Sequence, residues 1–432
     1  MRWQRRKISA KGNAQGVGSG KDARATVTRP HAAKRCKLAQ GSKYSSPIGG
    51  GAARAPWRLS VLLALSLAAC APVPASQESA QTAASEALRF DVTSASTARA
   101  TTTAPEPLAP YEGADWPRYL YALELPRERD YVIVSYLPPA VAVDLRSPEA
   151  MRRTLTDGLT DPLGVVAAKT KLGHSIVAWQ CGAAQGVTSF TGEDDGQALK
   201  MILSGWGVVP VLSTFEDGHL YTEAGFNPRH DRAMRSGKGV VTAVEVSRAR
   251  CEGLRDALRR FLTHPDVPAR NFGLLLDPAR FEGAGCLSFA WFISGAAGVI
   301  GDMAPLYRRV VEVRAGQIGR GSALAASVVP WQPPGGLPEH RLSLASLLMS
   351  DWDEGPVADR LSLPDGEIFL AAMIAMRAGV APADDWRPTR VLAAADPNVV
   401  RATTAAQRYA AGFAVRRIAD PEGVAALVLE RR

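Results

Sequence analysis

The sequence predicts an α+β fold, in which an antiparallel sheet packs against a buried helix and a helical extension follows. Three observations support this prediction. Runs rich in β-branched and aromatic residues recur between 131 and 246, apolar residues follow helical spacing over 250–263, and the stretch 286–300 is almost continuously apolar. Strands clustered in one part of a chain, with helices packed on one side of them, are typical of α+β proteins.

The composition is that of a water-soluble globular chain, with 46% hydrophobic and 22% charged residues among 432. The formal net charge of +9 is confined to the start of the chain, because residues 1–58 hold 14 basic residues against the single acidic Asp22. The remaining residues carry a net charge of −4. A folded nucleic-acid-binding domain carries its basic charge on its globular part, so we predict no nucleic-acid partner.

Residues 1–69 are interpreted as a basic leader that ends in a secretory signal peptide. A positive flank precedes the apolar run 59–69, which is shorter than the ~20 residues that span a bilayer. The run ends in Leu-Ala-Ala-Cys70, which resembles the lipobox of bacterial lipoproteins and implies that Cys70 is lipidated and becomes the mature N-terminus. The alternative is an ordinary cleaved signal with an incidental cysteine. Signal peptides are usually ~15–30 residues long, so we also expect translation to begin after Met1.

The lipobox resemblance also implies a location. Because Ala71 rather than Asp follows the lipidated cysteine, similarity to sorted bacterial lipoproteins implies attachment to the outer membrane, facing the periplasm. The membrane, through the lipid anchor, is therefore the first expected partner.

Beyond the signal, composition divides the chain into three parts. Residues 70–114 are rich in Ala, Pro, Ser and Thr, which predicts a lipid-anchored flexible tether. Residues 115–300 form the α+β domain, with order beginning near Trp116, and residues 301–432 form a mainly helical extension. The sequence leaves two alternatives open: the extension is a separate domain, or its helices pack on the α+β domain.

Each expected element follows from a local pattern. The strand candidates are, in order, 131–137, 175–179, 187–190, 208–212, 239–246 and 272–276. The helix candidates are 250–263, 286–300, a helix capped by Asp365 that ends at Gly379, and most of the Ala-rich tail 401–432.

Several common catalytic motifs are missing from the sequence. It contains no Gly-x-Ser-x-Gly, no His-Glu-x-x-His and no Cys-x-x-Cys, so a serine-elbow hydrolase and the commonest zinc sites lack support. We therefore expect neither a metal nor a cofactor.

Cysteine and histidine remain as candidates for chemistry. With Cys70 lipidated, the exported chain keeps Cys181, Cys251 and Cys286, and at least one of the three must stay unpaired. Cys286 follows a Gly-Ala-Gly turn and begins the buried helix, where the helix dipole and unpaired N–H groups stabilise a thiolate nucleophile. His174 at the start of a strand supplies a base, and Cys181 is expected to be buried or paired with Cys251.

The segments Leu-Gly-His174-Ser and Gly-Ala-Gly-Cys286-Leu-Ser-Phe, in that order, resemble the circularly permuted papain-like superfamily. These are relatives of the NlpC-type cell-wall peptidases in which the histidine strand precedes the cysteine helix. The resemblance covers roughly 130–300 and implies that Cys286 is the nucleophile and His174 the general base. It also implies a third polar residue that orients the imidazole from the next strand, which offers Thr188, with Gln185 as the alternate.

The leading hypothesis is a lipid-anchored cell-envelope cysteine hydrolase or acyltransferase that acts on an amide or an ester. Cell-wall peptide is the substrate class that the resemblance and the compartment imply, so peptidoglycan or lipid is the expected substrate partner. The alternative is a non-catalytic envelope lipoprotein that uses the same fold for binding or assembly.

Overall fold

The computed structural model divides the chain into two units, Met1–Ala98 and Arg99–Arg432. All residues that the structure describes belong to the second unit. They are 107–112, 115–139, 143–160, 173–192, 196–221, 228–377, 396–419 and 425–432. The predicted leader, Cys70 and nearly all of the predicted tether 70–114 lie outside the described residues.

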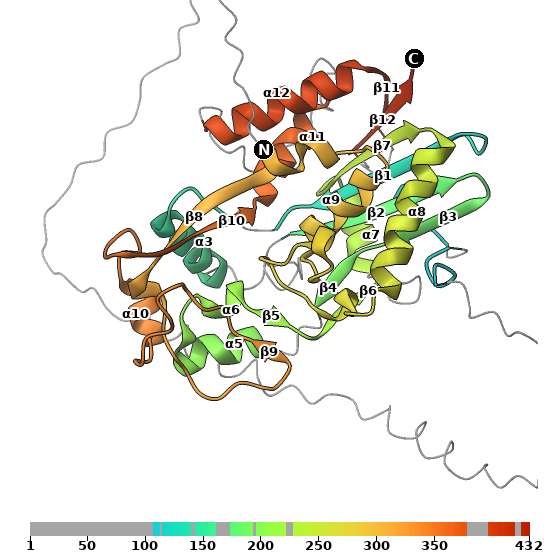
Figure 1. Cartoon of the computed structure of the whole chain (residues 1–432). Coiled ribbons are helices and arrows are strands. Elements are labelled where there is room, and N and C mark those ends of the chain that lie inside the picture. Colours follow the sequence, from blue (N-terminus) through green and yellow to red (C-terminus); the bar gives the residue numbers. More distant parts are fainter. Residues whose placement is uncertain are drawn as a thin grey trace, which may run out of the picture. The chain divides into compact units, whose positions relative to one another are not determined.

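A six-stranded sheet lies at the centre of this unit, in the order β11-β12-β7-β1-β2-β3 (Figure 1). Its strands are β1 (Asp130–Leu137), β2 (His174–Cys181), β3 (Ala184–Thr188), β7 (Val240–Val246), β11 (Phe413–Ala419) and β12 (Ala425–Arg431). Neighbouring strands are antiparallel except β12 and β7, which run parallel. The α+β class is therefore correct, but the sheet is mixed rather than antiparallel. A parallel pair needs a long crossover, and the helices between β7 and β12 in the chain provide one.

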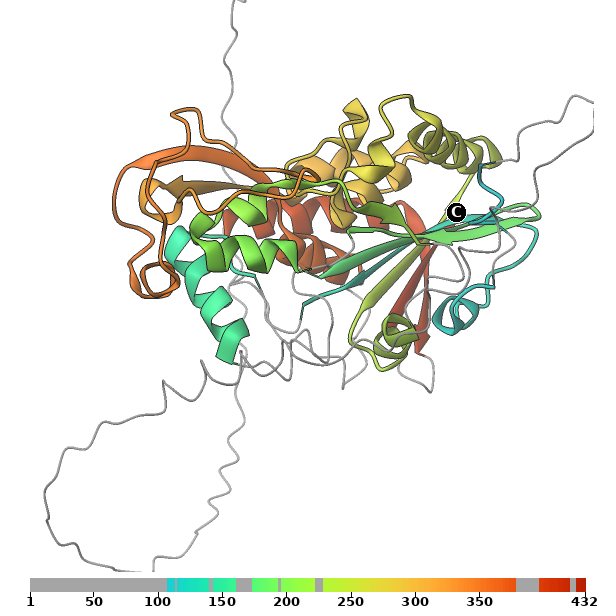
Figure 2. The same cartoon turned by 90° about the horizontal axis from the view of Figure 1, so that it is seen from below.

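Helices cover both faces of the sheet (Figure 2), which explains why every residue of β1 and β2 is buried. Alternate residues point to opposite faces. In β2, Val177 and Trp179 point to one face of the sheet and Ile176 and Ala178 to the other. The face of Val177 is covered by α8 (Arg248–Thr263), α9 (Cys286–Ala296), α11 (Gly366–Ala375) and α12 (Pro397–Ala411). The face of Ile176 is covered by α2 (Arg118–Tyr121) and α7 (Pro228–Arg235).

The larger core cluster joins residues from both sides of position 300. Phe261 of α8 and Phe289 of α9 pack in the same cluster as Phe369 of α11 and Val399 of α12. The segment after residue 300 therefore completes the core of the sheet instead of lying beside it.

A third core cluster lies around a two-stranded sheet and contains Trp206, Val311 and Leu347. It is built from β8 (Arg308–Arg314), β10 (Val357–Pro364), α3 (Pro148–Thr160), α5 (Gln197–Met201), a π-helical turn (Ile202–Trp206), α6 (Val209–Leu212) and α10 (Leu344–Met349). The remaining short strands are β4 (Phe190–Gly192) paired with β6 (Gly218–Leu220), and β5 (Thr214–Phe215) paired with β9 (Val328–Val329). Short 3-10 helices cover Pro268–Arg270, Pro278–Arg280, Gly301–Tyr307 and Ala315–Gln317.

Two strand predictions are wrong. The run 208–212 contains the helix α6, because Pro210 lies in the first turn, where its missing N–H is tolerated. The run 272–276 is not a strand, since only Phe272 forms bridges, to Phe215 and Ala284. Within 187–190 the chain also leaves the sheet, because β3 ends at Thr188.

The prediction of a mainly helical tail over 401–432 is wrong beyond α12. Residues 413–419 and 425–431 form a hairpin, β11 and β12, whose second strand lies beside β7. Leu427, Val428 and Leu429 are fully buried, so packing in the sheet decides their conformation despite the Ala-rich context. Among the described residues, no helix has the length and apolar character needed to cross a membrane.

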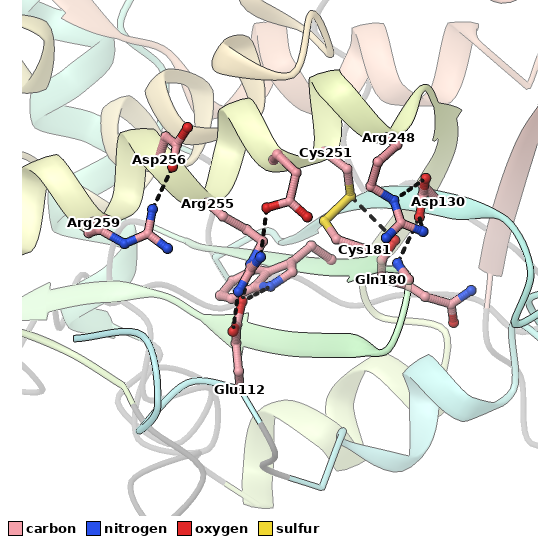
Figure 3. A network of polar contacts seen from close by, with 12 residues as sticks. Glu112, Asp130, Gln180, Cys181, Arg248, Cys251, Arg255, Asp256 and Arg259 are labelled. Carbon is pink, nitrogen blue, oxygen red and sulfur yellow. Dashed lines mark hydrogen bonds and ion pairs between the residues drawn. A yellow bond between two sulfur atoms is a disulfide. The ribbon is translucent and has the colours of Figure 1, made fainter. Parts of the chain in front are cut away.

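Cys181 and Cys251 form a disulfide, as the sequence analysis predicted, with Cα atoms 5.6 Å apart. It links the last residue of β2 to the first turn of α8. Asp130 pairs with Arg248 beside the bridge and also accepts a hydrogen bond from the backbone of Gly182 (Figure 3). These contacts fix the end of β2 that lies away from His174.

Replacing both Cys181 and Cys251 with alanine is expected to lower the free energy of unfolding by about 2–4 kcal/mol, because the bridge closes a long loop of the unfolded chain. The sequence separation of the two cysteines is 70 residues. Urea denaturation of the purified variant measures the loss, and reduced wild-type protein is the control, with the same expected loss. An unchanged urea midpoint in both samples would contradict a stabilising bridge.

Candidate active site

Cys286 is the first residue of α9, as predicted, and is the free cysteine of the described residues. Gly285 caps the helix, and its N–H donates to the hydroxyl of Ser288 at 3.0 Å. The thiol lies against the start of β2, where it donates to the carbonyl of Gly173 at 3.8 Å. The glycines before Cys286 thus bring the helix start close to the strand.

Burial raises the pKa of the Cys286 thiol, while the backbone N–H groups of Ser175, Leu287 and Cys286 itself act in the opposite direction. The N–H groups expected at the helix start are therefore present and directed at the sulfur. In this state burial outweighs them, so the sulfur keeps its proton at neutral pH.

His174 is the first residue of β2, and its side chain is buried. The ring stacks on His230 of α7 with centroids 4.6 Å apart, and it makes a T-shaped contact with Tyr221 with centroids 5.9 Å apart. Burial, and then the neighbouring His230, lower the pKa of His174 to about 3. The imidazole is therefore neutral at pH 7 and accepts a proton only in acid.

Ser189 determines which imidazole nitrogen accepts that proton. Its Oγ lies 2.7 Å from Nε2 of His174 and 2.7 Å from the carbonyl oxygen of Ser175. A carbonyl only accepts, so the single hydroxyl proton of Ser189 goes to Ser175, and Nε2 of His174 must donate to the hydroxyl. The lone pair of the ring is then on Nδ1.

Ser189, rather than Thr188 or Gln185, is thus the residue that the structure places against the imidazole. Thr188 donates its hydroxyl to the carbonyl of Tyr221 at 3.0 Å, and Gln185 donates to the side chain of Gln180 at 3.0 Å. The reason is that β3 ends at Thr188, so the next residue turns toward His174. The sequence analysis chose Thr188, and the residue that contacts the imidazole is the next one in the chain, Ser189.

The structure brings the thiol and the histidine to the same end of β2. The sulfur of Cys286 contacts the backbone of Gly173 and Ser175, the two neighbours of His174. Within the described part of the chain, no hydrogen bond joins the thiol to the imidazole.

The two side chains nevertheless lie on opposite faces of the sheet. The side chain of His174 points with Ile176 toward α7, whereas Cys286 begins α9, which packs on the face of Val177 and Trp179. The structure therefore places the sulfur on the backbone beside His174 and does not place the imidazole toward it.

Tyr136 and Glu367 also lie at this site, and sequence reasoning missed both. Tyr136 of β1 is directly opposite Ser175 in the sheet register. Burial raises its pKa well above the usual value, and the negative charges of Glu367, Cys286 and Asp365 add to this effect. No sequence signal identifies Tyr136, because a tyrosine within an apolar strand is typical of a core.

A buried cluster of three charges holds the start of α11 near these residues. Arg309 of β8 donates to Asp365 at 2.6 Å and to Asp396 at 2.8 Å. Each aspartate also caps a helix, Asp365 that of α11 and Asp396 that of α12. Arg309 thereby joins two helix starts that are separated in the sequence.

Among the described residues, no group of three His, Cys, Asp or Glu side chains is placed to hold a metal ion. Comparison with known proteins finds no matching family model, no matching curated protein and no matching solved structure. Function must therefore be argued from the site itself.

Proposed function

We propose that this chain is a lipid-anchored envelope enzyme that transfers or hydrolyses an acyl group through the thiol of Cys286. One observation carries the proposal. The sulfur lies at the first residue of a buried helix, where backbone N–H groups are directed at it. A thiol at the start of a helix that packs on the histidine strand resembles the permuted papain-like arrangement, which we propose as the finer description of the fold.

In the proposed reaction the sulfur of Cys286 bonds to the acyl carbon, its proton passes to water that enters with the substrate, and the carbonyl π pair moves to oxygen. Collapse of this intermediate expels an amine or an alcohol, which takes that proton from the water. A second water then releases the acyl group in a hydrolase, and a second amine or alcohol releases it in a transferase.

Substrate entry must also change the solvation of the site. Burial raises the pKa of the thiol, so the proton stays on sulfur in the state that the structure describes. Admission of a polar acyl group hydrates the thiol and opposes this effect. Cell-wall peptide is the proposed substrate class, supported by the signal and by a disulfide of the kind found in oxidising compartments.

The test is acylation of the full-length protein, extracted from membranes in detergent, by p-nitrophenyl acetate. We expect release of nitrophenol with a burst equal to the enzyme concentration, and peptide mapping of the acetyl group to Cys286. Absence of any acetylated Cys286, in protein whose thiol still reacts with methyl methanethiosulfonate, would reject the enzyme.

That rejection would support the second candidate, a non-catalytic envelope lipoprotein. The observation in its favour is the closed state itself, in which a buried imidazole donates to Ser189 and does not contact the thiol. The same experiment therefore separates the two functions.

The proposed anchor predicts a change of location. Replacing Cys70, which lies outside the described residues, with alanine removes the acceptor of the lipid and should move the protein from the membrane fraction to the soluble envelope fraction. Fractionation followed by immunoblotting measures this. Cys36→Ala is the matched control and should leave the protein in the membrane fraction. Wild-type protein in the soluble cytoplasm would contradict the anchor.

A further inference from the structure

Tyr136 of β1 is fully buried, and its hydroxyl has no hydrogen-bond partner among the residues that the structure describes. Nearly all buried polar groups are hydrogen-bonded, and one left without a partner costs about 1–3 kcal/mol. A donor kept unpaired at that cost in the resting protein needs an explanation.

The Tyr136 hydroxyl and the Cys286 thiol both lie near Gly173. A Cβ atom built on Gly173 would be 2.5 Å from the Tyr136 hydroxyl oxygen, and the carbonyl of the same Gly173 accepts from Cys286 at 3.8 Å. Across the sheet, Tyr136 pairs with Ser175, whose N–H is directed at the sulfur. The hydroxyl and the sulfur therefore both approach Gly173.

Two glycines make room for this hydroxyl. Gly173 has φ +82°, which only glycine adopts without strain, and a side chain on Gly366 would also collide with the Tyr136 oxygen. The chain thus brings backbone from before β2 and from the start of α11 against one phenol. Any side chain at either position would displace the hydroxyl from the neighbourhood of the thiol.

We propose that Tyr136 is a catalytic residue of the Cys286 site, whose hydroxyl donates a hydrogen bond to the acyl oxygen of the substrate. The inference rests on the proposed thiol acyl transfer and names the group that stabilises its intermediate. When the S–C bond forms, the carbonyl π pair becomes an oxyanion, and the phenol proton hydrogen-bonds to it without being transferred. Collapse restores the carbonyl, and the amine or alcohol leaves with the proton that the thiol released.

The absence of a hydrogen-bond partner fits this role, because a hydroxyl that donates to the substrate needs no protein acceptor when the substrate is absent. The pKa of Tyr136 is raised well above its usual value, first by burial and then by the charges of Glu367, Cys286 and Asp365, so the phenol keeps the proton that it must donate. Tyr119 of α2 is also a fully buried tyrosine, but it lies in the other core cluster. Proximity to Cys286 therefore distinguishes Tyr136, and Tyr119 provides a matched control.

The test compares Tyr136→Phe and Tyr119→Phe with wild-type full-length protein, using two reagents and one stability measurement. Acylation by p-nitrophenyl acetate passes through an oxyanion, whereas reaction with methyl methanethiosulfonate at the same sulfur does not. Tyr136→Phe should lower the acylation rate about 100-fold, the usual effect of losing one oxyanion donor, and leave the thiosulfonate rate unchanged. Its urea midpoint should stay equal or rise, because the lost hydroxyl was unpaired. Tyr119→Phe should acylate at the wild-type rate.

Two results would overturn the inference while leaving the enzyme intact. One is wild-type acylation by Tyr136→Phe. The other is an equal slowing with both reagents, since the hydroxyl would then act on the thiol or on the fold rather than on the acyl oxygen. A wild-type thiol that reacts with the thiosulfonate but is never acylated overturns the proposed enzyme instead, and the role of Tyr136 with it.

Discussion

Replacing Cys286 with serine is expected to abolish acylation by p-nitrophenyl acetate, with a fall of at least about 1,000-fold. A serine hydroxyl at this position has a far higher pKa than a thiol, so it supplies far less of the anionic nucleophile. The side chains differ by one atom, so the fold should persist. Nitrophenol release and intact mass of the acetylated protein measure the loss.

Two further variants give this prediction its controls. His174→Gln changes a side chain on the face of the sheet opposite to the sulfur and should keep acylation near the wild-type rate, and His264→Gln should likewise have no effect. His264 is a suitable match because its ring stacks on Phe281, with centroids 4.1 Å apart, away from the described contacts of Cys286. Equal rates in Cys286→Ser and wild type would show that another nucleophile reacts and would reject the proposed site.

Replacing Arg309 with leucine is expected to give the largest loss of stability, about 3–5 kcal/mol, because it leaves two buried carboxylates without their cation. Arg309, Asp365 and Asp396 are all buried, and each aspartate also caps a helix. Urea denaturation measures the loss. Arg308→Leu on the same strand is the control. Among the described residues the side chain of Arg308 bonds to Ser362, at an exposed position, and its loss should cost less than about 1 kcal/mol.

The loss should depend on pH in a defined direction. Burial already raises the pKa of Asp365 above 3.8 in the presence of Arg309, and removal of the cation raises it further. Above pH 3.8 the unfolded chain has lost a proton that the folded variant retains, so the stability of the variant falls as the pH rises. The difference from wild type is therefore largest near pH 7 and smaller near pH 4. Adding Asp365→Asn and Asp396→Asn, which keep both caps, should recover much of the loss, and a variant as stable as wild type at pH 7 would contradict the expected cost.

Local signals in the sequence were sufficient to place His174 and Cys286. A histidine before a β-branched run begins β2, and a cysteine after a glycine turn begins α9, because such boundaries depend on neighbouring residues. Asp365 was recognised as a helix cap for the same reason, and its carboxylate accepts from the N–H groups of Glu367 and Ile368. The Cys181–Cys251 bridge could be predicted because only three cysteines, Cys181, Cys251 and Cys286, follow the predicted lipidation site in the sequence.

Contacts between distant segments could not be predicted in this way. Ser189 reaches His174 only because β3 ends one residue earlier, and Tyr136 lies at the site only through its register with β2. The strand β12 was predicted as helix because its alanines and leucines favour helix locally. Pairing with β7, a long-range contact, decides its conformation.

The position of β12 in the sheet has a consequence for the order of folding. The strand pairs with β7 on one side and β11 on the other, yet it follows both the nucleophile helix and α12 in the chain. Such non-local pairing slows folding, and a chain that emerges N-terminus first must leave one edge of β7 open until β12 arrives. The Cys181–Cys251 bridge needs only β2 and α8, so oxidation can tie the early part of the sheet together during that interval. The thiol site would then be completed last, because α11 and α12 complete the core around it.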